Sequence, residues 1–320
     1  MARIQEVPLS DIDLDDHPFA VASSADISPL SASMAEVGLL NPPWLRKKAE
    51  AGWQVVTGLK RLKSAARLRW EKIAAHTLSA ETPDSRCLSI ALQDNAFGRS
   101  FSPGEQVFYI NRLTKHWDEA QIVQHFLPLL GLPPSAKILH RFLAAGSLEE
   151  AWQDLLVSGR LALTAAARLA AWPAAARRAA FPFFRDLPFS QSKQEELLKW
   201  LELLARRQDK ALEDFLLKPE LTACLEDPAL NPQEKAQRVR RRLKDWTFPR
   251  LSAALRAFEQ GLAGLGLAQH PRVRLSPPPA FEGPDFHLEI KFRDADELRS
   301  LLDTLTSLAR QEDFSALTAI

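Results

Sequence analysis

The chain of 320 residues has few cysteines and no long apolar run, and both absences exclude classes of protein. Its two cysteines, Cys87 and Cys224, lie far apart and show no C-x-x-C spacing, so neither a zinc site nor a disulfide framework is indicated. A reducing cytoplasm fits this composition. Acidic residues stand among the first apolar ones, so we also expect no signal peptide, and no segment predicts a membrane span.

A large excess of charge of either sign is absent too. Lys and Arg total 41 and Asp and Glu total 40, which gives a formal net charge of +1, so any surface for nucleic acid must be local. Hydrophobic residues make up 46% of the chain and charged residues 25%, an ordinary balance for a folded protein. Because a single core rarely grows past about 250 to 300 residues, the length predicts two or three domains.

The most informative stretch runs from Gln54 to Trp70, where a β-branched run meets a glycine and then changes to helical spacing. Residues 55–57 favour a strand, and Gly58 permits a tight, left-handed turn. The following helix is predicted to begin near Lys60, from residues at three- and four-residue steps: Leu62, Ala65, Ala66 and Arg69. A helix N-terminus with Lys60 and Arg61 in its first turn is a seat for phosphate. The alternative interpretation is a solvated surface, because strand-glycine-helix junctions are common.

Three segments around this stretch resemble motifs of the ParB family of chromosome and plasmid partition proteins. Residues 38–42, 58–61 and 94–98 match that family's Gly-Leu-Leu-x-Pro, Gly-Glu-Arg-Arg and Glu-Asn-x-x-Arg motifs, which together form a pocket for CTP and magnesium. The resemblance therefore implies nucleotide binding by Gly38, Leu39, Gly58, Leu59, Lys60, Arg61, Asn95 and Arg99. It also implies that Asn95 holds Mg²⁺.

The chain departs from these motifs at positions that matter for chemistry. Leu59 replaces the acidic residue of the turn, and Lys60 replaces an arginine. Asp94 is one carbon shorter than the glutamate that the family links to hydrolysis, and Gly98 stands where the last motif has arginine, with Arg99 as its nearest substitute. The resemblance thus assigns Asp94 as the catalytic residue, and we expect CTP binding with slow or absent hydrolysis.

Residues 1–100 are predicted to form a small α/β domain. Its expected elements are strands at 4–8, 43–46 and 73–78, a helix at 28–37 and the strand-turn-helix described above, with 89–93 completing the unit. Ser28 and Pro29 are a favourable helix start, because serine can cap free N–H groups and proline is tolerated in the first turn. Gly38 is expected to end that helix.

Residues 101–172 are predicted to be helical and to contain a helix-turn-helix. Ser102 and Glu105 have capping-box spacing ahead of a helix over 105–115. Short helices at 118–126 and 134–144, joined by a turn at 127–132, have the layout of a DNA-binding pair, which the ParB family places after its asparagine motif. The second helix would read base edges with Ser135, Lys137, His140 and Arg141, and would pack through Ala136, Ile138, Leu139 and Phe142. A purely structural helix pair is the alternative.

The remaining residues divide into a helical region of unknown role at 173–246 and a last segment at 247–320. The run 238–244 is the densest positive cluster; it is either a solvated helix face or a phosphate contact that salt would weaken. The last segment predicts a helix at 251–265 stopped by Gly266, strands at 272–276 and 286–292, and a helix at 296–308. This order is similar to the C-terminal dimerisation domain of ParB proteins and implies a homodimer.

The leading hypothesis is an α+β multidomain, ParB-like protein that binds CTP, closes as a clamp on double-stranded DNA and acts in partition or nucleoid organisation. The resemblance implies a cytoplasmic, nucleoid-associated protein with a ParA-like ATPase as a further partner. One alternative is a transcriptional regulator that has lost nucleotide control, which the departures at Leu59, Asp94 and Gly98 favour. The other is a ParB-like nuclease, for which the sequence offers no His or carboxylate cluster.

Overall fold

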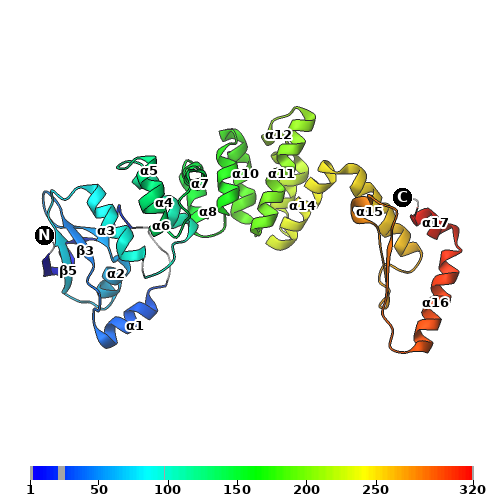
Figure 1. Ribbon diagram of the computed structural model, residues 1–320, viewed down its shortest axis with the longest axis horizontal. Coiled ribbons are helices and arrows are strands. Elements are labelled where there is room, and N and C mark those ends of the chain that lie inside the picture. Colours follow the sequence, from blue (N-terminus) through cyan, green and yellow to red (C-terminus); the bar gives the residue numbers. More distant parts are fainter. Residues whose placement is uncertain (1–2, 21–25, 97, 319–320) are drawn as a thin grey trace. The chain divides into compact units, whose positions relative to one another are not determined.

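The computed structural model describes residues 3–20, 26–96 and 98–318. The chain divides into two compact units (Figure 1). Unit 1 consists of Met1–Arg177 with Phe189–Glu195, and unit 2 of Arg178–Pro188 with Glu196–Ile320. The finer division predicted from the sequence, with boundaries near residues 100, 172 and 246, stays a prediction.

Unit 1 begins with a five-stranded mixed sheet in the order β1-β5-β3-β4-β2. Its strands are β1 (Arg3–Pro8), β2 (Ile12–Asp13), β3 (Trp44–Lys47), β4 (Trp53–Thr57) and β5 (Lys72–Leu78). β1 runs antiparallel to β5 with Val7 opposite Ile73, whereas β3 is parallel to β5 and antiparallel to β4. Because Val55 and Val56 at the end of β4 are fully buried, this strand delivers the following turn from a fixed position in the core.

Three helices accompany the sheet: α1 (Ser28–Val37), α2 (Leu59–Arg67) and α3 (Asp84–Ala96). α1 packs against α2, and α3 packs against β4. Gly38 ends α1 as predicted, with a φ of +77° and its N–H donating to the Met34 carbonyl. The predicted serine cap is wrong, because Ser28 is the first helical residue and its hydroxyl instead accepts from Arg67 at 2.9 Å.

One further prediction in this part needs correction. α2 ends at Arg67, so Arg69 is not on it and has a φ of +57° in the turn that follows. Residues 89–93 lie inside the longer helix α3, whose buried side is formed by Cys87, Leu88, Ala91 and Leu92. Both elements were recognisable from spacing, but a turn residue that fits a helical step cannot be distinguished from a helical one by spacing alone.

The rest of unit 1 is helical. Its elements are α4 (Pro103–Leu113), α5 (Glu119–Gln121), the π-helical turn η2 (Ile122–Phe126), α6 (Leu127–Leu129), α7 (Ala136–Gly146), α8 (Glu150–Val157) and α9 (Leu163–Ala170). The next helix, α10 (Ala174–Asp186), begins in unit 1, and its residues from Arg178 onward belong to unit 2. The Ser102–Glu105 capping box is confirmed. α4 packs against α7 and α8, and α7 packs against α9.

The helix predicted at 118–126 is longer and less regular than expected. It continues through η2 into α6, so Leu127 to Leu129 are helical rather than part of a turn. The Leu127 N–H donates to Ile122, five residues back, next to Pro128, which has no N–H to donate. The connection to α7 therefore spans residues 130–135 and includes Gly131 with a φ of +73°.

Unit 2 contains helices followed by a hairpin and two more helices. Its elements include α11 (Gln191–Gln208), α12 (Leu212–Leu216), α13 (Pro219–Glu226), α14 (Pro232–Thr247), α15 (Pro249–Gly264), β6 (Val273–Ser276), the 3-10 turn η3 (Pro279–Phe281), β7 (His287–Ile290), α16 (Ala295–Ala309) and α17 (Glu312–Thr318). β6 and β7 pair antiparallel with Leu275 opposite Leu288. Gly266, with a φ of +72°, follows α15 as predicted, whereas α17 was not predicted. Within the described residues, every helix is too short or too polar to cross a membrane.

Candidate functional site

The site is organised by the junction between β4 and α2. Gly58 has a φ of +87°, and a Cβ atom there would lie 2.7 Å from Pro43 Cβ, so a residue with a side chain would clash as well as be strained. The sharp turn lets α2 begin at Leu59, as the sequence predicted to within one residue. No side chain caps this N-terminus, so its first-turn N–H groups remain oriented for an anion.

A cavity of about 300 Å³ lies over this N-terminus. Its lining residues are Ala20, Leu30, Val56, Thr57, Gly58, Leu59, Lys60, Arg61, Asn95, Arg99, Glu105 and Tyr109. We call this the α2 cavity. It brings together all of the residues predicted for nucleotide binding except Gly38 and Leu39, and Leu39 instead packs against the core of the sheet. A role for those two residues stays a prediction.

Arg61 connects three segments of the chain at the edge of the α2 cavity. Its Nη1 atom donates to the Asn41 carbonyl at 2.6 Å, and its Nη2 atom lies 3.1 Å from Asp94 Oδ2. The same Asp94 oxygen accepts from the Thr57 hydroxyl at 2.5 Å. Asp94 therefore positions Arg61 and the end of β4.

Arg99 approaches the α2 cavity from the other side and is paired to Glu105. Its Nη1 and Nη2 atoms lie 2.9 and 2.7 Å from the two carboxylate oxygens, a bidentate geometry. Hydrogen bonding to Glu105 raises the pKa of Arg99. Burial acts to raise the pKa of Glu105, but hydrogen bonds from Arg99 and Ser102 outweigh it and hold that pKa below its usual value.

Asn95 also lines the α2 cavity and lies four residues before Arg99 in the chain. Its amide nitrogen donates to the Ala91 carbonyl at 2.8 Å, which orients the side-chain oxygen toward Arg99 Nε at 3.4 Å. Mg²⁺ prefers oxygen ligands and keeps several of them from water or phosphate, so one amide oxygen fits a metal that arrives with a nucleotide. No group of three His, Cys, Asp or Glu side chains that could hold a metal by itself occurs in the described part of the chain.

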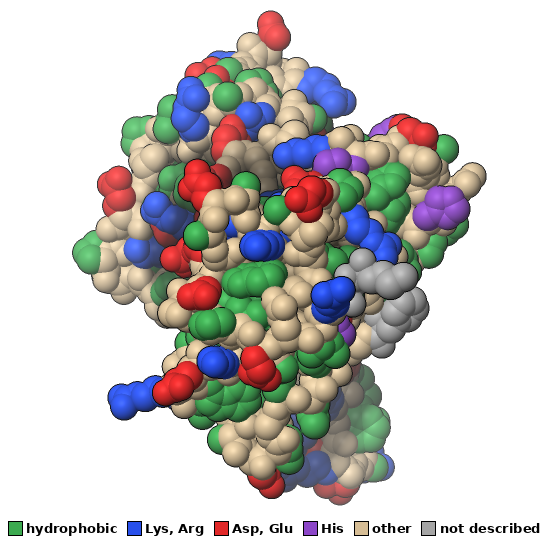
Figure 2. All heavy atoms as spheres, turned by 90° about the vertical axis from the view of Figure 1, so that its left-hand side faces the viewer, with side chains coloured by type: hydrophobic (Ala, Val, Ile, Leu, Met, Phe, Trp, Pro, Cys, Tyr) green, Lys and Arg blue, Asp and Glu red, His purple; other side chains and the backbone are tan. Residues whose placement is uncertain are grey.

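The charge at the α2 cavity suits a polyanion. Lys60 is exposed and forms no ion pair with any residue that the structure describes, and Arg61 and Arg99 add two guanidinium groups. On the molecular face shown in Figure 2, Lys and Arg side chains are interspersed with Asp and Glu, in agreement with the small net charge. The cations of this site are thus concentrated by the fold and not by a basic composition.

Sequence reasoning missed the contribution of α4 to the site. Glu105 was recognised only as a helix cap, and Tyr109 was not recognised, although both line the α2 cavity. Burial raises the pKa of Tyr109, so its phenol stays protonated and is a hydrogen-bond donor. The four-residue spacing of Glu105 and Tyr109 is enough to predict that they share one face of a helix. The spacing does not predict that this face lies against the asparagine motif at residues 94–98.

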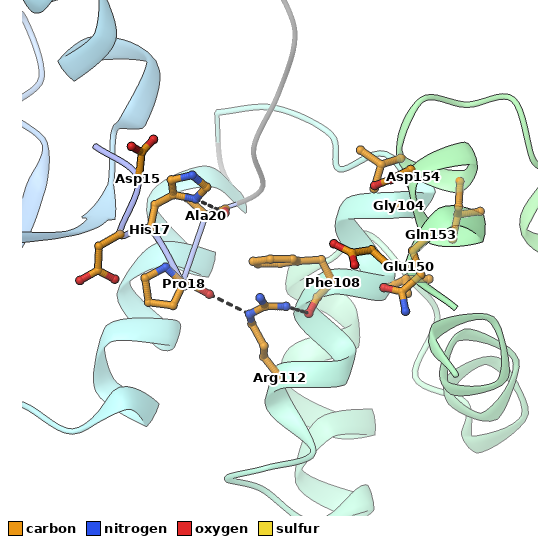
Figure 3. A pocket seen from close by; sticks show the side chains of 14 residues that line it. Asp15, His17, Pro18, Ala20, Gly104, Phe108, Arg112, Glu150, Gln153 and Asp154 are labelled. Atoms are coloured by element: carbon orange, nitrogen blue, oxygen red, sulfur yellow. Dashed lines mark hydrogen bonds between the residues drawn. The ribbon is translucent and has the colours of Figure 1, made fainter. Parts of the chain in front are cut away.

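A second, larger cavity of about 490 Å³ lies on another face of α4 (Figure 3). Arg112 donates to the Pro18 carbonyl at 2.7 Å, and its guanidinium lies 3.4 Å from the centre of the Phe108 ring. Burial lowers the pKa of Arg112. α4 therefore contributes to two cavities. The α2 cavity contains Lys60, Arg61 and Arg99, whereas the second cavity is lined by four carboxylates, namely Asp15, Asp16, Glu150 and Asp154. Ala20 lines both cavities.

The residues predicted to read DNA lie at the start of α7. Lys137, His140 and Arg141 are exposed, and Ser135 is the half-buried N-cap, with no side-chain capping bond. His140 Nε2 lies 3.2 Å from Glu119. Leu139 and Phe142 form the buried side with Ala145, but Ala136 is exposed and does not belong to it. Base contact by these side chains stays a prediction.

The N-terminal residues are similar to known proteins. A model described as the ParB N-terminal domain matches residues 1–96. Nucleoid occlusion proteins of Bacillus cereus (strain AH187) and Bacillus thuringiensis (strain Al Hakam) are 29% identical over 94 residues, which are 29% of this chain and 32% of theirs. The match thus spans about a third of the length of these curated relatives.

Two solved structures of C-terminally truncated ParB from Caulobacter crescentus are also similar. The one complexed to the centromeric parS site is 20% identical with a TM-score of 0.36, and the similarity covers 61% of this chain and 98% of that one. The one complexed with CTP-gamma-S is 22% identical with a TM-score of 0.26, covering 57% and 99%.

Proposed function

We propose that the chain, whose residues 1–96 match the model of the ParB N-terminal domain, is a ParB-like DNA-binding protein that holds CTP in the α2 cavity. CTP binding would close two copies of the chain into a clamp on double-stranded DNA. The protein would act in partition or nucleoid organisation, with a ParA-like ATPase as a partner.

One observation carries the nucleotide part of the proposal: an uncapped helix N-terminus opens into a cavity that also receives three cations. A triphosphate brings several negative charges. When it leaves water for a protein site, only cations and N–H donors can take the place of the lost hydration. Lys60, Arg61 and the N–H groups of α2 would bind the phosphates. Asn95 would add its amide oxygen to an Mg²⁺ that the phosphates carry.

Hydrolysis is expected to be slow or absent in this proposal. Asp94, the residue assigned to it by resemblance, has one carboxylate oxygen engaged by both Thr57 and Arg61. An oxygen held by two donors is less available to contact an attacking water. Its main role would therefore be to hold Arg61 in place.

The DNA part of the proposal assigns base contact to the exposed side of α7, and dimerisation to the C-terminal segment from α15 onward. Lys137 and Arg141 lie one helical turn apart on α7, as a recognition helix requires. β7 and α16 expose apolar side chains that a second copy would cover, namely Leu288 and Leu302.

Calorimetric titration with each of the four ribonucleoside triphosphates in the presence of Mg²⁺ tests the nucleotide part. The proposal predicts measurable heat with CTP and weaker or no heat with ATP, GTP and UTP. Equal affinity for all four would contradict recognition of the base.

A second candidate is a DNA-binding regulator without nucleotide control. The Arg99–Glu105 pair favours it, because a guanidinium already bound bidentately at 2.7 and 2.9 Å gains little from a phosphate. This candidate predicts unchanged DNA binding with and without CTP, measured by fluorescence anisotropy.

A further inference from the structure

We propose that a groove along α14 is a second contact surface for the phosphate backbone of DNA. The inference rests on the DNA binding of the proposed function, but on residues of unit 2 that this function does not use. The groove has a volume of about 540 Å³ and is lined by Trp200, Leu230, Glu234, Gln237, Arg238, Arg240, Arg241 and Lys244. The carboxylate of Glu234 is engaged in the cap of α14, where it accepts from the Asn231 N–H at 2.9 Å.

The sequence of α14 separates an apolar side from a basic one. Ala236, Val239 and Leu243 are buried in steps of three and four residues, so the helix is fixed to unit 2 through that side. From residue 238 to residue 244 the helix carries five cations and no carboxylate. Since the whole chain has a net charge of only +1, this stretch is a strong local excess.

Two of these cations are neutralised within unit 2. Arg240 is paired with Glu196 and its guanidinium lies 5.9 Å from the centre of the Trp200 ring, and Arg238 lies 3.1 Å from Asp227. Arg241 and Lys244 have no carboxylate partner among the described residues, although they are three residues apart and repel each other. An anion in the groove would relieve this repulsion.

The spacing of the row suits a phosphodiester strand. Arg238, Arg241 and Lys244 follow one another at steps of about 4.5 Å along the helix axis, so the row extends over about 9 Å. Phosphates of one DNA strand are separated by about 3.4 Å along the duplex axis, so the row has about the length of two to three phosphate steps. Arg238 and Arg240, which are paired with carboxylates, line the groove beside Arg241 and Lys244.

The groove is built for backbone contact and not for reading bases or inserting into a lipid surface. Trp200 is only 9% exposed and lies under Arg240, so it offers no platform on which a base could stack. A helix that lies in a membrane surface needs apolar side chains exposed beside its cations, whereas the apolar row of α14 is buried. The contact is thus independent of DNA sequence.

The test uses the full chain and a fluorescent duplex of random sequence, with affinity measured between 50 and about 200 mM salt. Each lost phosphate contact lowers the slope of log affinity against log salt by about 0.9, so Arg241→Ala/Lys244→Ala should lower it by about 2 and weaken binding roughly tenfold at low salt. Arg242→Ala is the matched control, because Arg242 is exposed on the same helix but does not line the groove. Arg241→Lys should keep the slope.

The outcomes separate this inference from the proposed function. DNA contact by the groove is supported if the double variant keeps its thermal unfolding midpoint and its CTP affinity but has a lower slope of log affinity against log salt. If the unmodified chain binds the duplex and the double variant has the same slope, or if Arg242→Ala lowers the slope as much as the double variant does, the groove is not a DNA contact. Loss of binding to vesicles containing phosphatidylserine, with DNA binding unchanged, would overturn the inference in favour of a membrane surface. If the unmodified chain binds no duplex, the DNA part of the proposed function fails as well.

Discussion

At the scale of single residues, the site depends on a glycine that cannot be replaced and on a carboxylate with two partners. Gly58 allows β4 to turn into α2, and Asp94 then fixes Arg61 relative to Thr57. The identity of the glycine could be predicted from the sequence, because β-branched residues before it and helical spacing after it leave little room for another turn. The pairing of Asp94 with Arg61 could not, since it joins residues 33 positions apart.

Replacement of Gly58 tests the role of this turn. Gly58→Ala should lower the free energy of unfolding by about 1 to 3 kcal/mol, because the left-handed φ strains alanine and its Cβ would lie 2.7 Å from Pro43. Chemical denaturation followed by circular dichroism measures the change. Gly264→Ala is the control: Gly264 is helical with open space around it, so alanine there should be neutral or stabilising by roughly 0.5 to 1 kcal/mol. Equal effects of the two substitutions would show that the turn tolerates a side chain.

At the scale of elements, α4 connects the α2 cavity with the helical part of unit 1. Its first turn carries Glu105, which accepts from the Ser102 N–H at 2.9 Å in the capping box and from Arg99 at the cavity. A change at the α2 cavity therefore has a direct route to the start of α4, which packs against α7.

The depressed pKa of Glu105 predicts how its contribution depends on pH. A carboxyl whose folded pKa lies below its unfolded value of about 4.5 stabilises the fold above that value, and the stabilisation is lost as pH falls through the folded pKa. Glu105→Gln should therefore cost about 1 kcal/mol at pH 7, and less when urea unfolding is repeated near pH 3.5. A cost that is the same at both pH values would mean that the charge of Glu105 contributes nothing.

In the proposed function, the exposed side of α7 sets the DNA sequence preference of the protein. Lys137→Ala and Arg141→Ala should each cost roughly 1 to 3 kcal/mol in binding to duplexes that the unmodified protein selects from a random pool. Lys115→Ala, an exposed cation outside α7, should leave the preference unchanged. Should both α7 variants select the same sequences with unchanged affinity, base reading belongs to another element.

Helices and strands could be predicted from the sequence where a local signal marks their ends. The capping box at Ser102, the stop at Gly38 and the antiparallel pair β6-β7 are confirmed. Two of the errors concern Pro128, which lies in helix α6 beside a π-helical turn, and α17, which lacks a strong start signal. In both cases packing with distant residues decides the backbone, and such packing is not encoded in local spacing.

At the scale of the whole molecule, the account requires two copies of the chain. The C-terminal hairpin and helix leave Leu288 49%, Phe292 51% and Leu302 45% exposed, which is costly for apolar side chains of one small core. Leu288→Asp/Leu302→Asp should convert a dimer into a monomer in sedimentation equilibrium. Leu217→Asp, at a residue 62% exposed outside this segment, should leave the dimer intact. A dimer that persists in the double variant would place the interface elsewhere.

The most direct test of the central claim is calorimetry with CTP and Mg²⁺ on the unmodified chain and on variants of the α2 cavity. We predict saturable heat for the unmodified chain and a loss of affinity of more than tenfold in Arg61→Ala and Lys60→Ala, since removing one partner of a desolvated charge contact costs about 2 to 5 kcal/mol. Lys63→Ala, on the same helix but outside the cavity lining, should bind as the unmodified chain does. Absence of heat with the unmodified chain, or equal affinities for all variants, would contradict nucleotide binding at this site.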